Sequence, residues 1–215
     1  MSALFHSYLC GRIAAEWLIA MPEEMNRTKK ALDGALRQLL GQKPLAQIRV
    51  REVTELCAIR RQSFYYHFTD VGQLFDWSLA RERAYLPTRQ EKCLTWQQAA
   101  ADLLAYTAES RSFYLAILEN RGRAGLRQVL EDATEQFLKA ALSYCRERSG
   151  VPPDPEAEHV RVLWWQTLLL TLIEDWLRGD LCQPPEEVIS LLERDLRDGM
   201  TGAAWRSLSQ SGTIE

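Results

Sequence analysis

Apolar residues recur at helical spacing along most of the chain, and the first clear stripe runs from residue 27 to residue 40. Asn26 is a suitable N-cap for this helix, and Gly41 is expected to end it. A second amphipathic helix is predicted over residues 51–57, followed by a tight turn at 58–60 whose Ile59 is an apolar plug between polar runs. This spacing predicts two short helices pinned together by a turn.

A third short helix is predicted to begin near Arg61. Phe64 and Phe68 lie four residues apart and therefore share one buried face. The other side chains of this helix then face solvent or border it. They are Arg61, Gln62, Ser63, Tyr65, Tyr66 and His67.

Helical patterns of apolar residues continue to about residue 196. Asp70 is expected to cap a fourth helix, and Pro87 is expected to end it. Thr95 with Gln98 predicts a capping box. Further helices are predicted up to 149, punctuated at Gly122 and Gly125, then from 155 to Gly179, and from about 185 to 196. The pattern indicates an all-α protein in which an N-terminal three-helix helix-turn-helix unit precedes a C-terminal helical bundle.

The helix predicted over residues 155–178 is apolar on more than one face. A monomer of this size would leave part of that surface wet, which favours a homodimer built on this helix and the next. The side chains expected at the dimer interface are Leu168, Leu172, Trp176, Val188 and Leu192.

Charge is distributed unevenly along the chain. Residues 27–67 hold nine Lys and Arg against three acidic residues, a net charge of +6, whereas the whole chain carries −3 and the remainder therefore carries −9. A basic helix is often only a solvated face. Here the excess coincides with the two-helix pattern, and Arg and Gln alternate with aromatic residues, which favours binding to the major groove of double-stranded DNA.

Several motifs resemble those of the TetR-type transcriptional regulators. They are TKKALDGALRQLL, VREVTEL, and SFYYHF followed by Asp70 and Leu74. The combination of RRQSFYYHF with FDW, and the later DWLRGDLCQPPEEVISLLERDL, is most similar to the subgroup of dihydroxyacetone-kinase operon activators.

The resemblance implies roles for individual side chains. Ser63, Tyr65 and His67 would hold phosphates. Arg51, Arg61, Gln62 and Tyr66 would face base edges, and Thr28 would also lie in the DNA-binding set.

The chain departs from the family pattern at several positions. Arg49 stands where a Ser or Thr cap is usual, Ala58 where Gly is usual, and Arg60 where Ser is usual. Val71 replaces a frequent phosphate-binding Lys, so that Arg49 or Arg60 would have to supply that contact.

No constellation for catalysis, metal or cofactor binding is found in the sequence, so no enzyme activity and no cofactor are expected. Five widely spaced cysteines indicate reduced thiols in the cytoplasm, and no apolar run is long enough for a membrane span. Six aromatic side chains either line an effector pocket or belong to the core: Trp96, Tyr106, Phe113, Tyr114, Trp164 and Trp165.

These observations predict a sequence-specific DNA-binding transcriptional regulator that binds a palindromic operator as a dimer. Its input would be a small-molecule effector or, alternatively, a regulatory protein. A helical ligand-binding or enzymatic body with a vestigial DNA-binding unit is the third alternative. The expected organisation is a peripheral extension at 1–25, the DNA-binding domain at 26–70 with a linking helix to about 86, the effector and dimerisation domain at 87–198, and a flexible tail at 199–215.

Overall fold

The computed structural model describes residues 23–149, 155–180 and 183–210, and every regular element in this part of the chain is helical. The all-α fold class is confirmed. The elements are α2 (Glu23–Leu40), the 3₁₀ turn η1 (Leu45–Gln47), α3 (Val50–Leu56), α4 (Arg61–His67), α5 (Val71–Gln90), α6 (Trp96–Glu109), α7 (Arg111–Ser149), α8 (Pro155–Arg178) and α9 (Pro185–Gln210).

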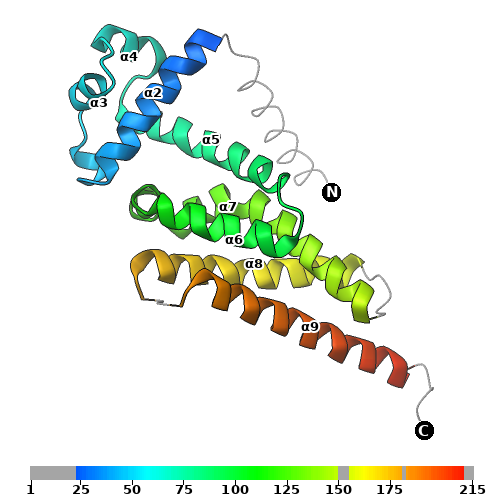
Figure 1. Ribbon diagram of the computed structural model, residues 1–215. Coiled ribbons are helices and arrows are strands. Elements are labelled where there is room, and N and C mark those ends of the chain that lie inside the picture. The colour runs from blue at the N-terminus through cyan, green and yellow to red at the C-terminus, as the bar shows by residue number, and fades with distance from the viewer. Residues whose placement is uncertain (1–22, 150–154, 181–182, 211–215) are drawn as a thin grey trace.

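Helices α2, α3 and α4 form what we call the N-terminal unit (Figure 1). Helix α3 packs against both α2 and α4. Leu32, Leu36, Val53 and Phe64 are fully buried in this unit, and Phe68 is almost so. The two short helices are thus held by side chains that the helical spacing placed on one face, since a seven-residue helix has little stability alone.

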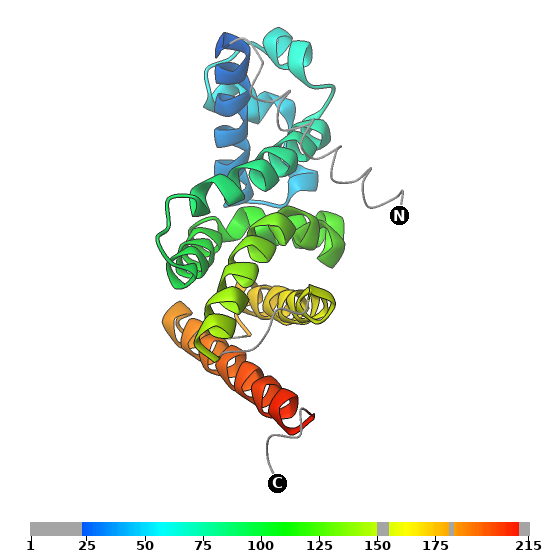
Figure 2. The same ribbon diagram turned by 90° about the vertical axis from the view of Figure 1, so that its right-hand side faces the viewer.

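Helices α6 to α9 form the body, with α7 at its centre. Helix α7 packs against α5, α6, α8 and α9. Helix α5 lies between the N-terminal unit and the body, and the layers follow one another from α4 to α9 along the molecule (Figures 1 and 2). Residues Leu74, Phe75 and Leu86 of α5 are buried. The position of α4 relative to α8 and α9 therefore depends on how α2 and α5 sit on the body.

Two helix ends differ from the sequence prediction. Helix α2 begins at Glu23, so Asn26 lies inside the helix and is not its cap. Helix α5 continues through Pro87 to Gln90. Proline removes one backbone donor near the end of the helix, but the following turn still closes through the bond from the Glu91 N–H to the Pro87 carbonyl at 3.3 Å.

Three glycines in the body differ in their effect on the helices that contain or precede them. Gly122 has φ 63° and ψ −167° and breaks α7 into two helical segments, as expected of a glycine at positive φ. Gly125 is part of the second segment. Gly179, with φ 89°, ends α8 as predicted.

At the C-terminal end, α9 extends to Gln210, whereas a tail was expected from residue 199. The expected extension at 1–25 falls largely outside the described residues. Within the described residues, no helix combines the length and apolarity that crossing a membrane would require.

Candidate nucleic-acid interface

The turn between α3 and α4 is a two-bond helix stop. The Ile59 N–H donates to the Thr54 carbonyl at 2.9 Å, and the Ala58 N–H donates to the Glu55 carbonyl at 3.3 Å. These are the two bonds of a Schellman motif, which requires a left-handed residue between them. Ala58 occupies that position with φ 54°. Ile59 packs against the core, as predicted, and this fixes the direction in which the chain enters α4.

The start of α3 is tied down by an acidic side chain from its first turn. The Arg49 N–H donates to Glu52 Oε2 at 3.0 Å, and Lys43 Nζ contacts Glu52 Oε1. The Lys43 ammonium and then the Arg49 amide lower the pKa of Glu52. Glu52 thus supplies one half of a capping box, the bond from the third helical position back to the N-cap amide. The other half, which a Ser or Thr side chain would supply, is absent, and the Glu52 N–H donates instead to the Arg49 carbonyl at 3.0 Å. The sequence reasoning missed Glu52 in this role.

Helix α4 exposes every side chain predicted to face DNA except His67, which is half-buried. Tyr65 and Tyr66 are 58% and 78% exposed, although tyrosines usually bury most of their rings. Phe64 on the opposite face is fully buried and edge-on to Tyr65 at 5.6 Å between ring centroids. The helix thus packs on the core through its apolar face and exposes its polar face to a partner.

Four of the predicted DNA-binding residues line one open depression in the surface. Arg49 and Arg51 come from the start of α3, and Arg61 and Tyr65 from α4. Asp70 and Gly72 at the start of α5 also line it, with apolar residues beside them. The cations concentrate positive charge at this site, which suits a phosphate backbone or an acceptor-rich base edge.

Two features modify the expected set of contacts. Arg51 donates to Glu55 at 2.6 Å, and this bond raises the pKa of Arg51. The guanidinium must leave Glu55, or use its remaining donors, in order to reach a base. Val71 is 8% exposed and belongs to the core, so this position cannot carry a phosphate-binding Lys without rearrangement.

His67 and Thr28 lie outside the depression. Burial, and then the nearby charge of Lys29, lowers the pKa of His67. Lys29 lies over the rings of Phe68 and Trp77 at 5.8 and 5.9 Å. Thr28 is half-buried on α2. Arg60, Gln62, Ser63 and Tyr66 are exposed but do not line the depression, so they extend the candidate surface around it.

The six aromatic residues considered for an effector pocket do not converge. Trp96, Phe113 and Tyr114 are buried, and Tyr106 and Tyr114 donate to the buried carboxylate of Glu82. Trp164 is 70% exposed and lines a groove between α8 and α9 together with Trp165. The alternative in which all six line one effector pocket is therefore wrong. Helical periodicity did not reveal that these side chains point in different directions.

The five side chains predicted for a dimer interface differ in their exposure. Leu168 is 48% exposed on α8, in line with Val160, Leu163 and Trp164. Leu192 is a core residue at 9% exposure, and its neighbour Leu191 is exposed instead. The remaining three predicted side chains line a narrow apolar crevice beside buried Leu104, between α8 and the start of α9: Leu172, Trp176 and Val188.

Comparison with known proteins points in the same direction. Residues 94–198 match the family model TetR_C_8, described as a transcriptional regulator C-terminal region. The HTH-type dhaKLM operon transcriptional activator DhaS of Lactococcus lactis subsp. lactis (strain IL1403) is 30% identical over 90 residues, which are 42% of this chain and 48% of the relative. The chain thus spans about half the length of the curated relative that it matches.

A solved structure has the same fold. The dihydroxyacetone kinase operon activator DhaS superposes with a TM-score of 0.66 at 21% identity, over 80% of this chain and 96% of that one. The resemblance to TetR-type regulators of this subgroup is confirmed. The matching family and both relatives are regulators of transcription, not enzymes.

Proposed function

We propose that this chain is a TetR-type regulator of transcription that binds double-stranded DNA through α4. The observation that carries the proposal is the exposed polar face of α4, held by buried Phe64 and set beside the arginines of α3. A short helix presented in this way after a tight turn matches the docking geometry of helix-turn-helix proteins, in which the second helix enters the major groove.

The exposed side chains divide by chemistry. Arg61 and Gln62, in the first turn of α4, carry the donors and acceptors that discriminate base edges. Ser63, Tyr65 and His67 offer single polar groups that suit phosphate oxygens. We assign Arg51 and Tyr66 to base reading, and Arg49, Arg60 and Thr28 to the DNA backbone.

We further propose that two copies associate through the exposed apolar stripe of α8, which consists of Val160, Leu163, Trp164 and Leu168. These residues recur three to four positions apart and so lie on one side of the helix. Leu191 of α9 adds to the exposed apolar surface. Two such helix pairs can cross as a four-helix bundle, and their two α4 helices would then meet successive major grooves about 34 Å apart, which requires a near-palindromic operator.

Selection of duplexes from a random pool tests the function. We expect the wild-type chain to enrich a near-palindrome. Arg61→Ala or Gln62→Ala should change the enriched bases at a loss of about 1 to 3 kcal/mol per contact, whereas Tyr65→Phe should weaken binding to all duplexes alike. Arg127→Ala, at a half-exposed arginine on α7, is the matched control. Failure of the wild-type chain to enrich any sequence would refute the proposal.

Light scattering at micromolar concentration tests the dimer. Leu168→Glu places a charge in the proposed interface and should yield a monomer mass. Leu94→Glu alters a leucine that is 91% exposed outside α8 and α9, and it should leave the dimer intact. A monomer mass for the wild-type chain would refute the dimer and, with it, the palindrome.

The regulatory input is proposed to be a small molecule or a partner protein acting in the cytoplasm. The separation of the six aromatic side chains removes the support for an effector pocket built from them. A thermal-shift screen of metabolites against candidate proteins distinguishes the two, because whichever binds the native state raises its melting temperature.

A further inference from the structure

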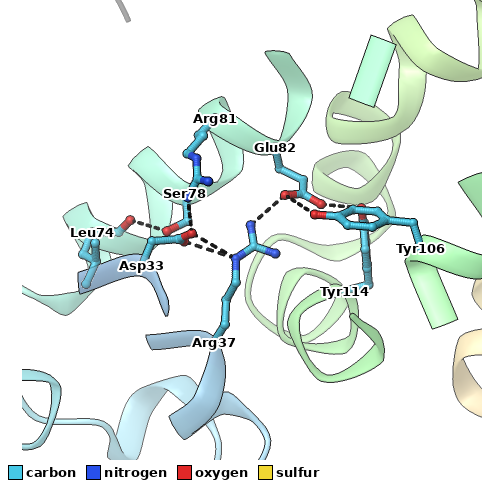
Figure 3. A network of polar contacts seen from close by, with 8 residues as sticks. All are labelled: Asp33, Arg37, Leu74, Ser78, Arg81, Glu82, Tyr106 and Tyr114. Atoms are coloured by element: carbon cyan, nitrogen blue, oxygen red, sulfur yellow. Dashed lines mark hydrogen bonds and ion pairs between the residues drawn. The ribbon is translucent and has the colours of Figure 1, made fainter. Parts of the chain in front are cut away.

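Four charged side chains meet where the N-terminal unit joins α5 (Figure 3). Arg37 of α2 donates through Nη2 to Glu82 of α5 at 2.6 Å, and through Nε to Asp33 of α2 at 3.1 Å. Arg81 of α5 donates to the same Asp33 carboxylate at 2.5 Å. Two arginines and two carboxylates thus form a closed set with no net charge.

Glu82 carries this set into the body. Tyr114 of α7 donates to Glu82 Oε1 at 2.7 Å, and Tyr106 of α6 donates to Oε2 at 3.3 Å (Figure 3). The Arg37 guanidinium also lies over the ring of Phe113 at 3.8 Å from its centroid. One arginine and one glutamate therefore connect four helices, of which α2 belongs to the N-terminal unit and α6 and α7 to the body.

Burial makes this arrangement selective for one position of α2. The side chains of Asp33 and Glu82 are each only 3% exposed. If α2 slid or turned on α5, at least one carboxylate would remain in the interior without its arginine, and an unpaired buried charge is strongly unfavourable. An apolar contact would tolerate small shifts, whereas this polar set favours one register.

The set is remote from the candidate DNA surface. Arg37 follows Thr28, the residue of α2 assigned to the DNA backbone, by nine residues, which corresponds to roughly 13 to 14 Å of helix. The described contacts of Arg37 and Glu82 all lie within the junction. Any influence on DNA must therefore pass through the orientation of the N-terminal unit.

We propose that Arg37 and Glu82 are positioning residues that fix the angle of the N-terminal unit on the body and thereby determine which spacing of operator half-sites the dimer accepts. This inference rests on the proposed function and on the proposed dimer. Within the described residues, the N-terminal unit is joined to the body by α5 and by packing of α2 on α7, and the charged set lies where these helices meet. A base pair added between half-sites moves them about 3.4 Å apart and rotates them by about 35°, so a rigid junction discriminates spacing and a loose one does not.

The experiment uses the duplex that the wild-type chain selects, rebuilt with one base pair removed and with one or two added between its half-sites. Affinities are measured by fluorescence anisotropy for the full chain and for Arg37→Gln, Glu82→Gln and Tyr114→Phe. Tyr114→Phe removes a single hydroxyl and retains the ring, so it remains informative if a charge variant does not fold. Arg83→Gln is the matched control, since Arg83 is the next residue of α5 and pairs with Asp132 of the body at 2.8 Å without reaching α2.

We expect the wild-type chain and Arg83→Gln to lose at least about tenfold in affinity for each altered spacing, comparable to one mismatched base pair. For Arg37→Gln and Tyr114→Phe, affinity should differ by less than about threefold between the spacings. The dependence of affinity on spacing should thus become flatter, which is distinct from a uniform loss of affinity. Folded variants that keep the wild-type profile would overturn the inference, as would an equal flattening by Arg83→Gln.

A measurement without DNA separates failure of the inference from failure of the proposed function. If the wild-type chain selects no duplex, the function is refuted and hydrogen exchange decides the junction. Arg37→Gln and Tyr114→Phe should then speed amide exchange in residues 33–40 and leave α8 unchanged, whereas Arg83→Gln should not affect 33–40. Unchanged exchange in residues 33–40 in both variants would show that the set does not hold α2.

Discussion

Replacing Ala58 by glycine is expected to stabilise the protein. Ala58 has φ 54°, and a left-handed conformation costs an L-residue with a Cβ about 1 to 2 kcal/mol. The side chain is exposed, so removal of its methyl group forfeits little packing. Glycine adds about 0.5 to 1 kcal/mol of conformational entropy to the unfolded chain. The difference leaves a gain of about 0.5 to 1 kcal/mol in the free energy of unfolding.

Urea unfolding and calorimetry at one fixed protein concentration measure this gain, because association of two copies would itself contribute to stability. For a chain of this size the melting temperature should rise by about 2 °C or slightly more. Ala31→Gly is the matched control, since Ala31 is also exposed but lies inside α2. There glycine should lower stability by about 1 kcal/mol. A loss of stability in Ala58→Gly, or the same sign in both variants, would refute the conformational argument.

Three further outcomes are expected. DNA affinity should fall by about 5 to 6 log units per log unit of salt for each protomer if the six exposed Lys and Arg side chains of residues 27–61 each neutralise one phosphate. Arg60→Gln should reduce that slope by about 0.9, and a slope near zero would contradict this. Burial, and then Glu82, raises the pKa of Tyr106 to about 12 and that of Tyr114 well above its usual value. Both pKa values exceed that of tyrosine in the unfolded chain, which is about 10, so the contribution of these groups to stability is complete below pH 10 and is lost as pH rises towards 12. An absorbance titration of tyrosine should therefore show two phenols that ionise at higher pH than the others, and only one in Tyr114→Phe. Glu82→Ala should cost about 3 to 5 kcal/mol in urea unfolding, since it removes one of the two carboxylates that pair with the largely buried Arg37 and leaves the hydroxyls of Tyr106 and Tyr114 without their acceptor. A cost below about 1 kcal/mol would show that the junction relaxes freely.

Local sequence rules predicted the short helices well. The spacing of Phe64 and Phe68 located α4 and its buried face, and Gly179 ended α8 as expected. These features depend on neighbours within a few residues, so periodicity and capping chemistry are sufficient to find them.

Features that depend on distant partners were not predictable in the same way. Arg37 contributed to the basic excess of residues 27–67, yet its partner Glu82 lies 45 positions away and holds it in the interior. Its neighbour Asp33 is buried with it, so the excess of +6 is unchanged when both are left out of the count. The aromatic set failed for the same reason, because spacing along a helix does not specify what the opposite helix presents.

The division of labour within α4 has a consequence for how such a protein changes over evolutionary time. Phe64 is its one fully buried side chain, and five of the seven residues from Arg61 to His67 are exposed. Substitutions at exposed positions usually alter stability by no more than about 0.5 kcal/mol. The target sequence can therefore drift through several generations of substitutions without a compensating change in the core, and duplicated copies of the gene could acquire separate operators while keeping the same scaffold.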